Sequence, residues 1–184
     1  MDDRFLAYKI LSKIERDKAY SNITVDTVLN ENEATSAPFV CALVYGVLER
    51  KITIDYILSK FLTQPIKKLN PQVLTLLRIG VYQIKYMDKV PSSAAVNESV
   101  KLSKKVKCAF ASGLINSVLR KVSTVEVSLP ETVDKTYDLS IKYSCPEQLV
   151  EHYVNDWNRF HATACVLCIS SGSFFLRLAF ACKL

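Results

Sequence analysis

Near its C-terminus the chain carries residue types that bind zinc. His161, Cys165 and Cys168 follow the pattern H-x3-C-x2-C, with His152 nine residues upstream of His161, and three such ligands can hold a zinc ion. The sequence around the second cysteine, V-L-C-I-S, is apolar and lacks the polar turn residues of a metal-binding knuckle. No βαβ pattern surrounds the two cysteines, which argues against a thiol redox site as well. We therefore predict no metal site and no redox site.

Other patterns that indicate catalysis are also missing from the sequence. There is no G-x-G-x-x-G or other glycine-rich phosphate loop, and no Ser-His-Asp set or pair of carboxylates stands out. We expect no catalytic residue and no cofactor-binding residue in this chain. The acidic start, M-D-D-R-F, lacks the pattern of an export signal, and the six cysteines are scattered. A cytoplasmic protein with reduced thiols is the expected class.

The strongest chemical signal is positive charge concentrated in the middle of the chain. The net charge of +6 divides into −2 for residues 1–36, +10 for residues 37–122, −5 for residues 123–158 and +3 for residues 159–184. A basic segment between acidic ones is typical of a protein that binds a polyanion such as RNA. The alternative is that the lysines only solvate outer helix faces. The candidate RNA-binding residues are Arg78, Lys85, Lys89, Lys101, Lys104, Lys105, Lys107, Arg120 and Lys121.

Arg78 differs from the other candidates because it lies among apolar residues, in L-L-R-I-G-V-Y-Q. An arginine in such a place either pairs with a carboxylate inside the fold, for which Glu98 is the candidate, or extends its guanidinium to a partner. Tyr82 and Tyr86 share helical spacing with Ile79, so we expect them to belong to the core rather than to stack on bases.

The lysines gather at the ends of predicted helices. Lys101 and Lys105 share a face with Glu98, while Lys104 and Lys107 lean away from it. We expect these four lysines to form one phosphate-binding patch together with two more, Lys85 and Lys89. The remaining two cations, Arg120 and Lys121, end the next helix, where positive charge also favours the helix dipole.

Helical periodicity accounts for most of the first 122 residues, and four glycines are too few for a fold rich in tight turns. Ser36 and the pair Asn70-Pro71 are good helix starts, Ser92 or Ser93 is the expected cap of the sixth helix, and Gly46 allows a neighbouring helix to approach closely. We predict an all-α domain of about seven helices and no strand. The expected helices cover about residues 4–16, 22–31, 37–50, 53–62, 71–87, 92–107 and 109–122.

The remainder of the chain differs in amino-acid composition. Residues 123–143 are rich in valine, threonine and acids, so we predict a linker or surface strap, followed by a helix over residues 146–157. Residues 159–184 form an almost wholly apolar tail, but the run S-S-G-S at 170–173 interrupts it. Such an interrupted run is a poor membrane span, and we expect the start of a further domain instead.

Four motifs resemble one family when taken in order. They are L-V-Y-G-V-L-E-R (43–50), L-N-P-Q-V-L-T-L-L-R-I-G-V-Y-Q-I-K-Y-M (69–87), V-P-S-S-A-A-V-N-E-S-V (90–100) and G-L-I-N-S-V-L-R-K (113–121). They are similar to the NusB-like domain, and more closely to its version in Fmu/Sun-type 16S ribosomal RNA cytosine-C5 methyltransferases. The segment Y-S-C-P-E-Q-L-V-E-H-Y-V-N-D-W also resembles the family's connection to the next domain, although the aromatic of the usual Pro-x-Trp is replaced by Gln148.

The resemblance implies a helical bundle of two subdomains that holds RNA near a catalytic domain. It divides the chain into an RNA-binding domain (1–122), a linker with a helix (123–158) and an apolar tail (159–184), in which Arg177 matches the family's next strand. The family's S-adenosylmethionine site and catalytic cysteines have no counterpart here. We therefore expect this chain alone to be inactive, with small-subunit rRNA, a separate methyltransferase domain or a ribosomal protein as partner, and no membrane.

The alternative implied by the same resemblance is a NusB-type antitermination factor that binds RNA together with a ribosomal protein. The NusB factors begin with an arginine-rich segment, where this chain has Asp2-Asp3-Arg4. RNA contacts of that type through the N-terminal end are therefore not expected.

Overall fold

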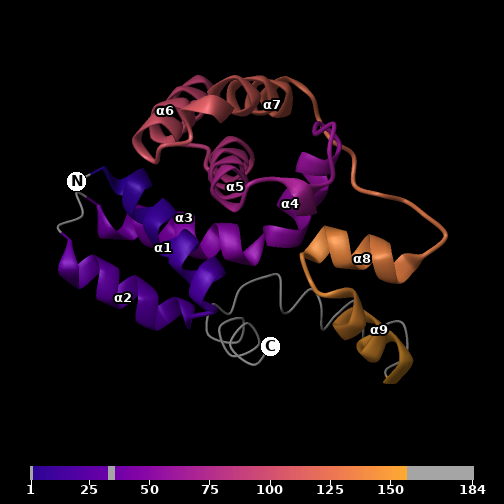
Figure 1. The fold of residues 1–184 in the computed structure, drawn as a ribbon. Helices are drawn as coiled ribbons and strands as arrows, with labels where there is room; N and C mark the ends of the chain where they lie inside the picture. The colour runs from indigo at the N-terminus through magenta and orange to yellow at the C-terminus, as the bar shows by residue number, and fades with distance from the viewer. Residues whose placement is uncertain (1, 33–35, 157–184) are drawn as a thin grey trace.

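The computed structural model describes residues 2–32 and 36–156, and these form helices and connecting segments without any strand. Figure 1 shows α5 at the centre of the fold, with α6 and α7 above it and α1 and α3 below it. The bundle consists of α1 (Asp3–Asp17), α2 (Ser21–Glu31), α3 (Ala37–Glu49), α4 (Lys51–Ser59), α5 (Pro71–Tyr86), α6 (Ser92–Lys105) and α7 (Ser112–Thr124). The all-α prediction, with its bundle of seven helices, is confirmed.

Local signals fix the starts of the central helices. The Asn70 side chain accepts a hydrogen bond from the Gln72 amide (2.9 Å), and Pro71 takes the first helical position. Ser36 caps α3 in the same way by accepting from the Phe39 amide. The expected cap at Ser92 or Ser93 is wrong: Pro91 stands at the cap position of α6 and no side chain bonds the first turn. Proline serves there because its fixed φ sets the direction in which the helix begins.

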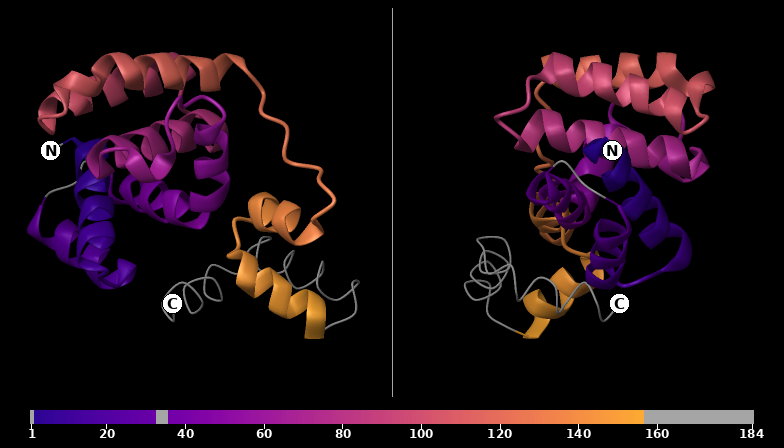
Figure 2. Two further views of the ribbon diagram at one scale, coloured as in Figure 1. Left: turned by 45° about the vertical axis from the view of Figure 1, so that its right-hand side comes forward. Right: turned by 90° about the vertical axis from the view of Figure 1, so that its left-hand side faces the viewer.

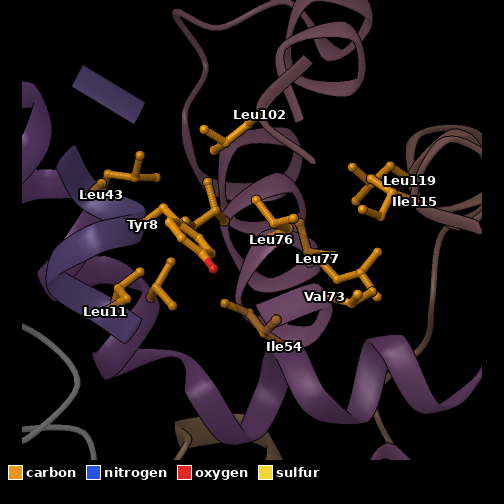
Figure 3. Packing of buried hydrophobic residues seen from close by; sticks show 14 of the residues in the cluster. Tyr8, Leu11, Leu43, Ile54, Val73, Leu76, Leu77, Leu102, Ile115 and Leu119 are labelled. Atoms are coloured by element: carbon orange, nitrogen blue, oxygen red, sulfur yellow. The ribbon is translucent and has the colours of Figure 1, made fainter. Parts of the chain in front are cut away.

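The core lies between α5 and the helices around it. Figure 3 shows Leu76 and Leu77 of α5 among side chains of α1, α3, α4, α6 and α7, and both leucines are fully buried. Gly46 of α3 lies against α5 so closely that a Cβ there would overlap the ring of Tyr82, as the sequence predicts for a close helix approach. Tyr82 and Tyr86 pack against this core with their ring centroids 5.5 Å apart, and burial raises the pKa of both phenols.

The predicted linker is only partly correct, because it contains a further helix. After an extended segment, α8 (Lys135–Tyr143) and then α9 (Glu147–Asp156) form a pair at the side of the bundle away from α6 (Figures 1 and 2). Asp134 begins α8 by accepting hydrogen bonds from the amides of Thr136 (2.9 Å) and Tyr137 (3.2 Å). The α8 backbone is anchored to α4, where the Thr53 hydroxyl donates to the Ile141 carbonyl at 2.6 Å in a buried contact.

Candidate nucleic-acid interface

Six of the fourteen basic side chains of residues 37–122 are carried by the outer layer of the bundle. Helices α6 and α7 are joined by a short 3-10 helix, η2 (Ala109–Ala111), and pack side by side on α5 (Figures 1 and 2). From residue 99 to residue 125 the chain has six basic side chains and no acidic one. The six are Lys101, Lys104, Lys105, Lys107, Arg120 and Lys121.

Four of these lysines lie together at the end of α6, and we call them the corner cluster: Lys101, Lys104, Lys105 and Lys107. Lys101 is paired with Glu98 at 2.8 Å, and Lys105 lies 3.8 Å from Asp2 and 4.5 Å from the centre of the Phe5 ring. Lys104 and Lys107 are exposed and have no carboxylate within ion-pair distance in the described part of the chain. Their charges are therefore available to a partner.

Lys107 is held in an unusual backbone conformation, with φ at 61°. It ends α6 in a motif in which the Cys108 amide donates to the Ser103 carbonyl (2.8 Å) and the Lys107 amide donates to the Lys104 carbonyl (3.3 Å). Glycine is usual at such a left-handed position because other residues suffer a contact between Cβ and the backbone. The motif fixes where the Lys107 side chain leaves the surface.

The other candidates lie at the opposite end of the layer. Lys85 at the end of α5 donates to the Val125 carbonyl just after α7 (3.4 Å), and Arg120 donates to Asn116 one turn earlier in α7 (3.1 Å). We call Lys85, Lys89, Arg120 and Lys121 the far cluster. The 14 residues of α6 separate it from the corner cluster by roughly 20 Å at 1.5 Å per residue. The structure thus divides the expected single patch into two clusters.

Arg78 belongs to neither cluster, because it is 6% exposed and paired inside the bundle. Its guanidinium binds both carboxylate oxygens of Asp55 (2.8 and 2.7 Å) and one oxygen of Glu15 (3.0 Å), which also pairs with Lys51 (2.6 Å). The expected partner Glu98 is therefore wrong, since it binds Lys101. With its donors engaged by α1 and α4, Arg78 serves the fold, and we leave it out of the RNA-binding surface.

The Arg78 network also shifts the titration of its central carboxylate. Burial alone would raise the pKa of Glu15, but the hydrogen bond and charge of Lys51, together with the charge of Arg78, bring that pKa below its ordinary value. Glu15 therefore stays ionised to lower pH in the folded protein, and three helices remain joined through it.

Sequence reasoning missed one residue of this surface, Phe110. Its side chain is 76% exposed in η2, three residues after Lys107. Its spacing of four from Leu114 gave it the pattern of a core residue. One feature of the sequence could have indicated that Phe110 is exposed. It lies in the connection between two helices, among the small residues of A-F-A-S-G.

The family model described as the NusB family matches residues 1–124. The chain belongs to the NusB family. Among its relatives, the probable ribosomal RNA small subunit methyltransferase B of Bacillus subtilis (strain 168) is 34% identical over 155 residues, which are 83% of this chain and 34% of that protein. The same-named protein of Synechocystis sp. is 32% identical over 159 residues, which are 85% of this chain and 36% of that protein. The chain thus spans about a third of the length of these methyltransferase relatives.

A shorter relative in the NusB family covers less of this chain. The transcription antitermination protein NusB of Ruminiclostridium cellulolyticum is 35% identical over 120 residues, which are 64% of this chain and 81% of that protein. The match to the Bacillus relative, at 155 residues, is longer than the 124 residues of the family model, so it includes part of the chain beyond them. Similarity to these two methyltransferase relatives therefore extends past the residues that the family model matches.

The N-terminal end of this NusB domain is engaged in its own fold. Asp2 caps α1 by accepting from the Arg4 amide (3.1 Å), and the Asp3 carboxylate accepts from the Ser36 amide (3.1 Å). The Arg4 guanidinium donates to Gln83 (2.7 Å) and lies over the Phe39 ring. These contacts hold Asp2, Asp3 and Arg4 against the rest of the fold.

The remaining sequence predictions concern metals, thiols and membranes. His161, Cys165, Cys168 and the apolar tail lie outside the described residues, and within residues 2–32 and 36–156 no group of ligands could hold a metal ion. The cysteines described there, Cys41, Cys108 and Cys145, are free thiols whose pKa values are raised by burial. No helix in the same ranges combines the length and apolar character that crossing a membrane requires.

Proposed function

We propose that this chain binds RNA through the layer formed by α6, η2 and α7, as the RNA-binding part of a small-subunit rRNA cytosine-C5 methyltransferase. The observation that carries the proposal is the stretch from residue 99 to residue 125, with six basic side chains and no carboxylate. A surface of this kind attracts phosphates and releases counterions when it binds them. Two relatives are called probable ribosomal RNA small subunit methyltransferase B, and we therefore propose small-subunit rRNA as the RNA that is bound.

The two clusters can contact one RNA segment. Their separation of roughly 20 Å, from the 14 residues of α6 at 1.5 Å per residue, is short enough for one RNA segment to span. The proposed RNA-binding residues are therefore Lys104 and Lys107 with the paired lysines beside them, and the cations of the far cluster. Lys101 and Lys105 can exchange their weak surface pairs for phosphates at little cost.

Catalysis is assigned to another part of the enzyme. The glycines described in the structure, Gly46, Gly80 and Gly113, all lie within helices, so no glycine-rich loop is present there to cradle S-adenosylmethionine. The described residues therefore do not fit this cofactor. We infer a division into an RNA-binding domain (1–122), a connecting segment (123–158) and the beginning of the next part (159–184).

The connecting segment supports the methyltransferase interpretation over a free-standing NusB factor. The Ile52 amide donates to the Ser144 hydroxyl (3.0 Å) and the Thr53 hydroxyl donates to the Ile141 carbonyl (2.6 Å), so α8 is held against α4. The second candidate function is transcription antitermination, favoured by the 81% coverage of the NusB protein of Ruminiclostridium cellulolyticum. The two functions differ in the RNA they require.

The test is binding of the full chain to fragments of small-subunit rRNA and to a boxA-type RNA over a series of salt concentrations. The variant Lys104→Glu/Lys107→Glu should lose binding, because it reverses two available charges. Lys9→Glu/Lys18→Glu is the matched control: it changes the net charge equally, and Lys18 also ends its helix with a positive φ (52°). Preference for the rRNA supports the methyltransferase interpretation, and preference for boxA supports antitermination. Equal loss in both variants, or no binding at low salt, refutes the proposed surface.

A further inference from the structure

Phe110 is an exposed aromatic ring beside the corner cluster. Its side chain is 76% exposed, and among the large apolar side chains whose exposure the structure describes only Val133 is more exposed. It stands in η2, where the chain turns from α6 into α7. An isolated exposed phenylalanine places its ring faces in water at an energetic cost that binding a planar apolar group would remove.

The surroundings of Phe110 leave its ring accessible. The residues beside it are small, and a Cβ placed on Gly113 would find no atom within 4 Å. Ser112, which adjoins Gly113, turns inward, since its hydroxyl donates to the Ala109 carbonyl (2.7 Å) and lies 3.0 Å from the Ser103 hydroxyl. The 76% exposure of the side chain shows that the described residues leave most of the ring uncovered.

Charge at this place selects the kind of partner. Lys107 lies three residues before Phe110, and the backbone hydrogen bonds that end α6 hold it in place. Lys104 lies one helical turn before Lys107. Each nucleotide of RNA combines a planar base with a charged phosphate. The Phe110 ring suits the base, and the two available lysines near it in the sequence suit the phosphates. A protein partner would need about 800 Å² of surface on each side, whereas the only large apolar neighbour exposed nearby on α7 is Leu114.

We propose that Phe110 stacks against one unpaired base of the bound RNA while Lys104 and Lys107 hold the neighbouring phosphates. The RNA segment at the end of α6 must then be single-stranded, because a base inside a duplex cannot offer its face. This inference rests on the proposed function and adds to it the conformation of the RNA and the residue that reads it.

The test compares one short oligoribonucleotide, taken from the rRNA fragment that binds best, as a single strand and annealed to its complement. Phe110→Leu keeps the apolar size and removes the aromatic face, and it should weaken binding of the single strand by about 5- to 100-fold. Its dependence on salt should stay unchanged, because no charge is lost. Phe110→Trp should retain binding, and its additional fluorescence should be quenched by the single strand.

Tyr20→Leu provides the matched control, because Tyr20 is also an exposed aromatic (58%) but lies at the start of α2. It should bind both forms of the RNA like the parent protein. If the parent protein binds RNA and Phe110→Leu binds the single strand equally well, the stacking role is refuted while the proposed function stands. Equal loss for single strand and duplex also refutes it. Failure of the parent protein to bind any RNA at low salt refutes the proposed function itself.

Discussion

Replacing Lys107 with glycine should stabilise the fold and weaken RNA binding at the same time. A non-glycine residue in the left-handed region costs about 1–2 kcal/mol, and Lys107 has a φ of 61°. Glycine removes this cost but loses about 0.5–1 kcal/mol through the greater freedom of the unfolded chain. The net gain is about 0.5–1 kcal/mol, which for a domain of this size raises the Tm by about 1–4 °C. The hydrogen bonds that close α6 use only backbone atoms at this position and should remain.

The same substitution removes one charge from the corner cluster. The slope of log affinity against log salt concentration should therefore become shallower by about 0.7–0.9. Thermal melting and a salt series of RNA binding measure the two effects independently. Lys18→Gly is the control, since Lys18 has a φ of 52° at the end of α1 and should give the gain in stability without the change in slope. An unchanged slope for Lys107→Gly, or an equal change for both variants, would refute the assignment of Lys107 to RNA.

Three further predictions concern the bundle that supports the surface. Arg78→Met should destabilise the protein by about 3–5 kcal/mol in urea unfolding, because Asp55 and Glu15 lose their guanidinium partner; Lys101→Met, which breaks the exposed pair with Glu98, should cost less than about 1 kcal/mol. The pKa of Glu15 is lowered in the folded state, so the contribution of its charge to stability is complete above the ordinary value of 4.5 and is lost as the pH falls through the lowered pKa. The difference in stability between the parent protein and Glu15→Gln should therefore shrink over that acid range. A constant difference would contradict the reasoning. Gly46→Ala should cost about 1–3 kcal/mol and disturb the near-ultraviolet circular dichroism of Tyr82, whereas Gly113→Ala meets open space and should leave stability unchanged or slightly raised.

Local chemistry was enough to predict much of the bundle. Asn70 and Pro71 begin a helix through a side-chain bond two residues away and a fixed φ, and neither effect depends on the rest of the fold. Gly46 in an apolar helix likewise predicts a close neighbour, which is Tyr82. These features extend over a few residues, so the sequence alone contains their cause.

Features that depend on distant residues could not be predicted in this way. Arg78 pairs with Asp55 and Glu15, which are 23 and 63 residues away on other helices, and many carboxylates are equally near in sequence. Helix α8 has only nine residues and is stabilised by its contact with α4, so its own periodicity is too short to be distinctive. Phe110 has the spacing of a core residue, and only the arrangement of α6 and α7 shows that nothing covers it.

The same arrangement turns a charge pattern along the sequence into a charge separation in space. The acidic segment after α7 would compete with phosphates if it folded back over the corner cluster, since its carboxylates would pair with the available lysines. The chain instead runs away from α7, and α8 and α9 lie on the other side of the bundle (Figures 1 and 2). The contacts of Ile141 and Ser144 with α4 hold α8 there. Anchoring α8 on α4 therefore keeps the carboxylates of α8 and α9 away from Lys104 and Lys107, whose charges stay available to the RNA that we propose binds there.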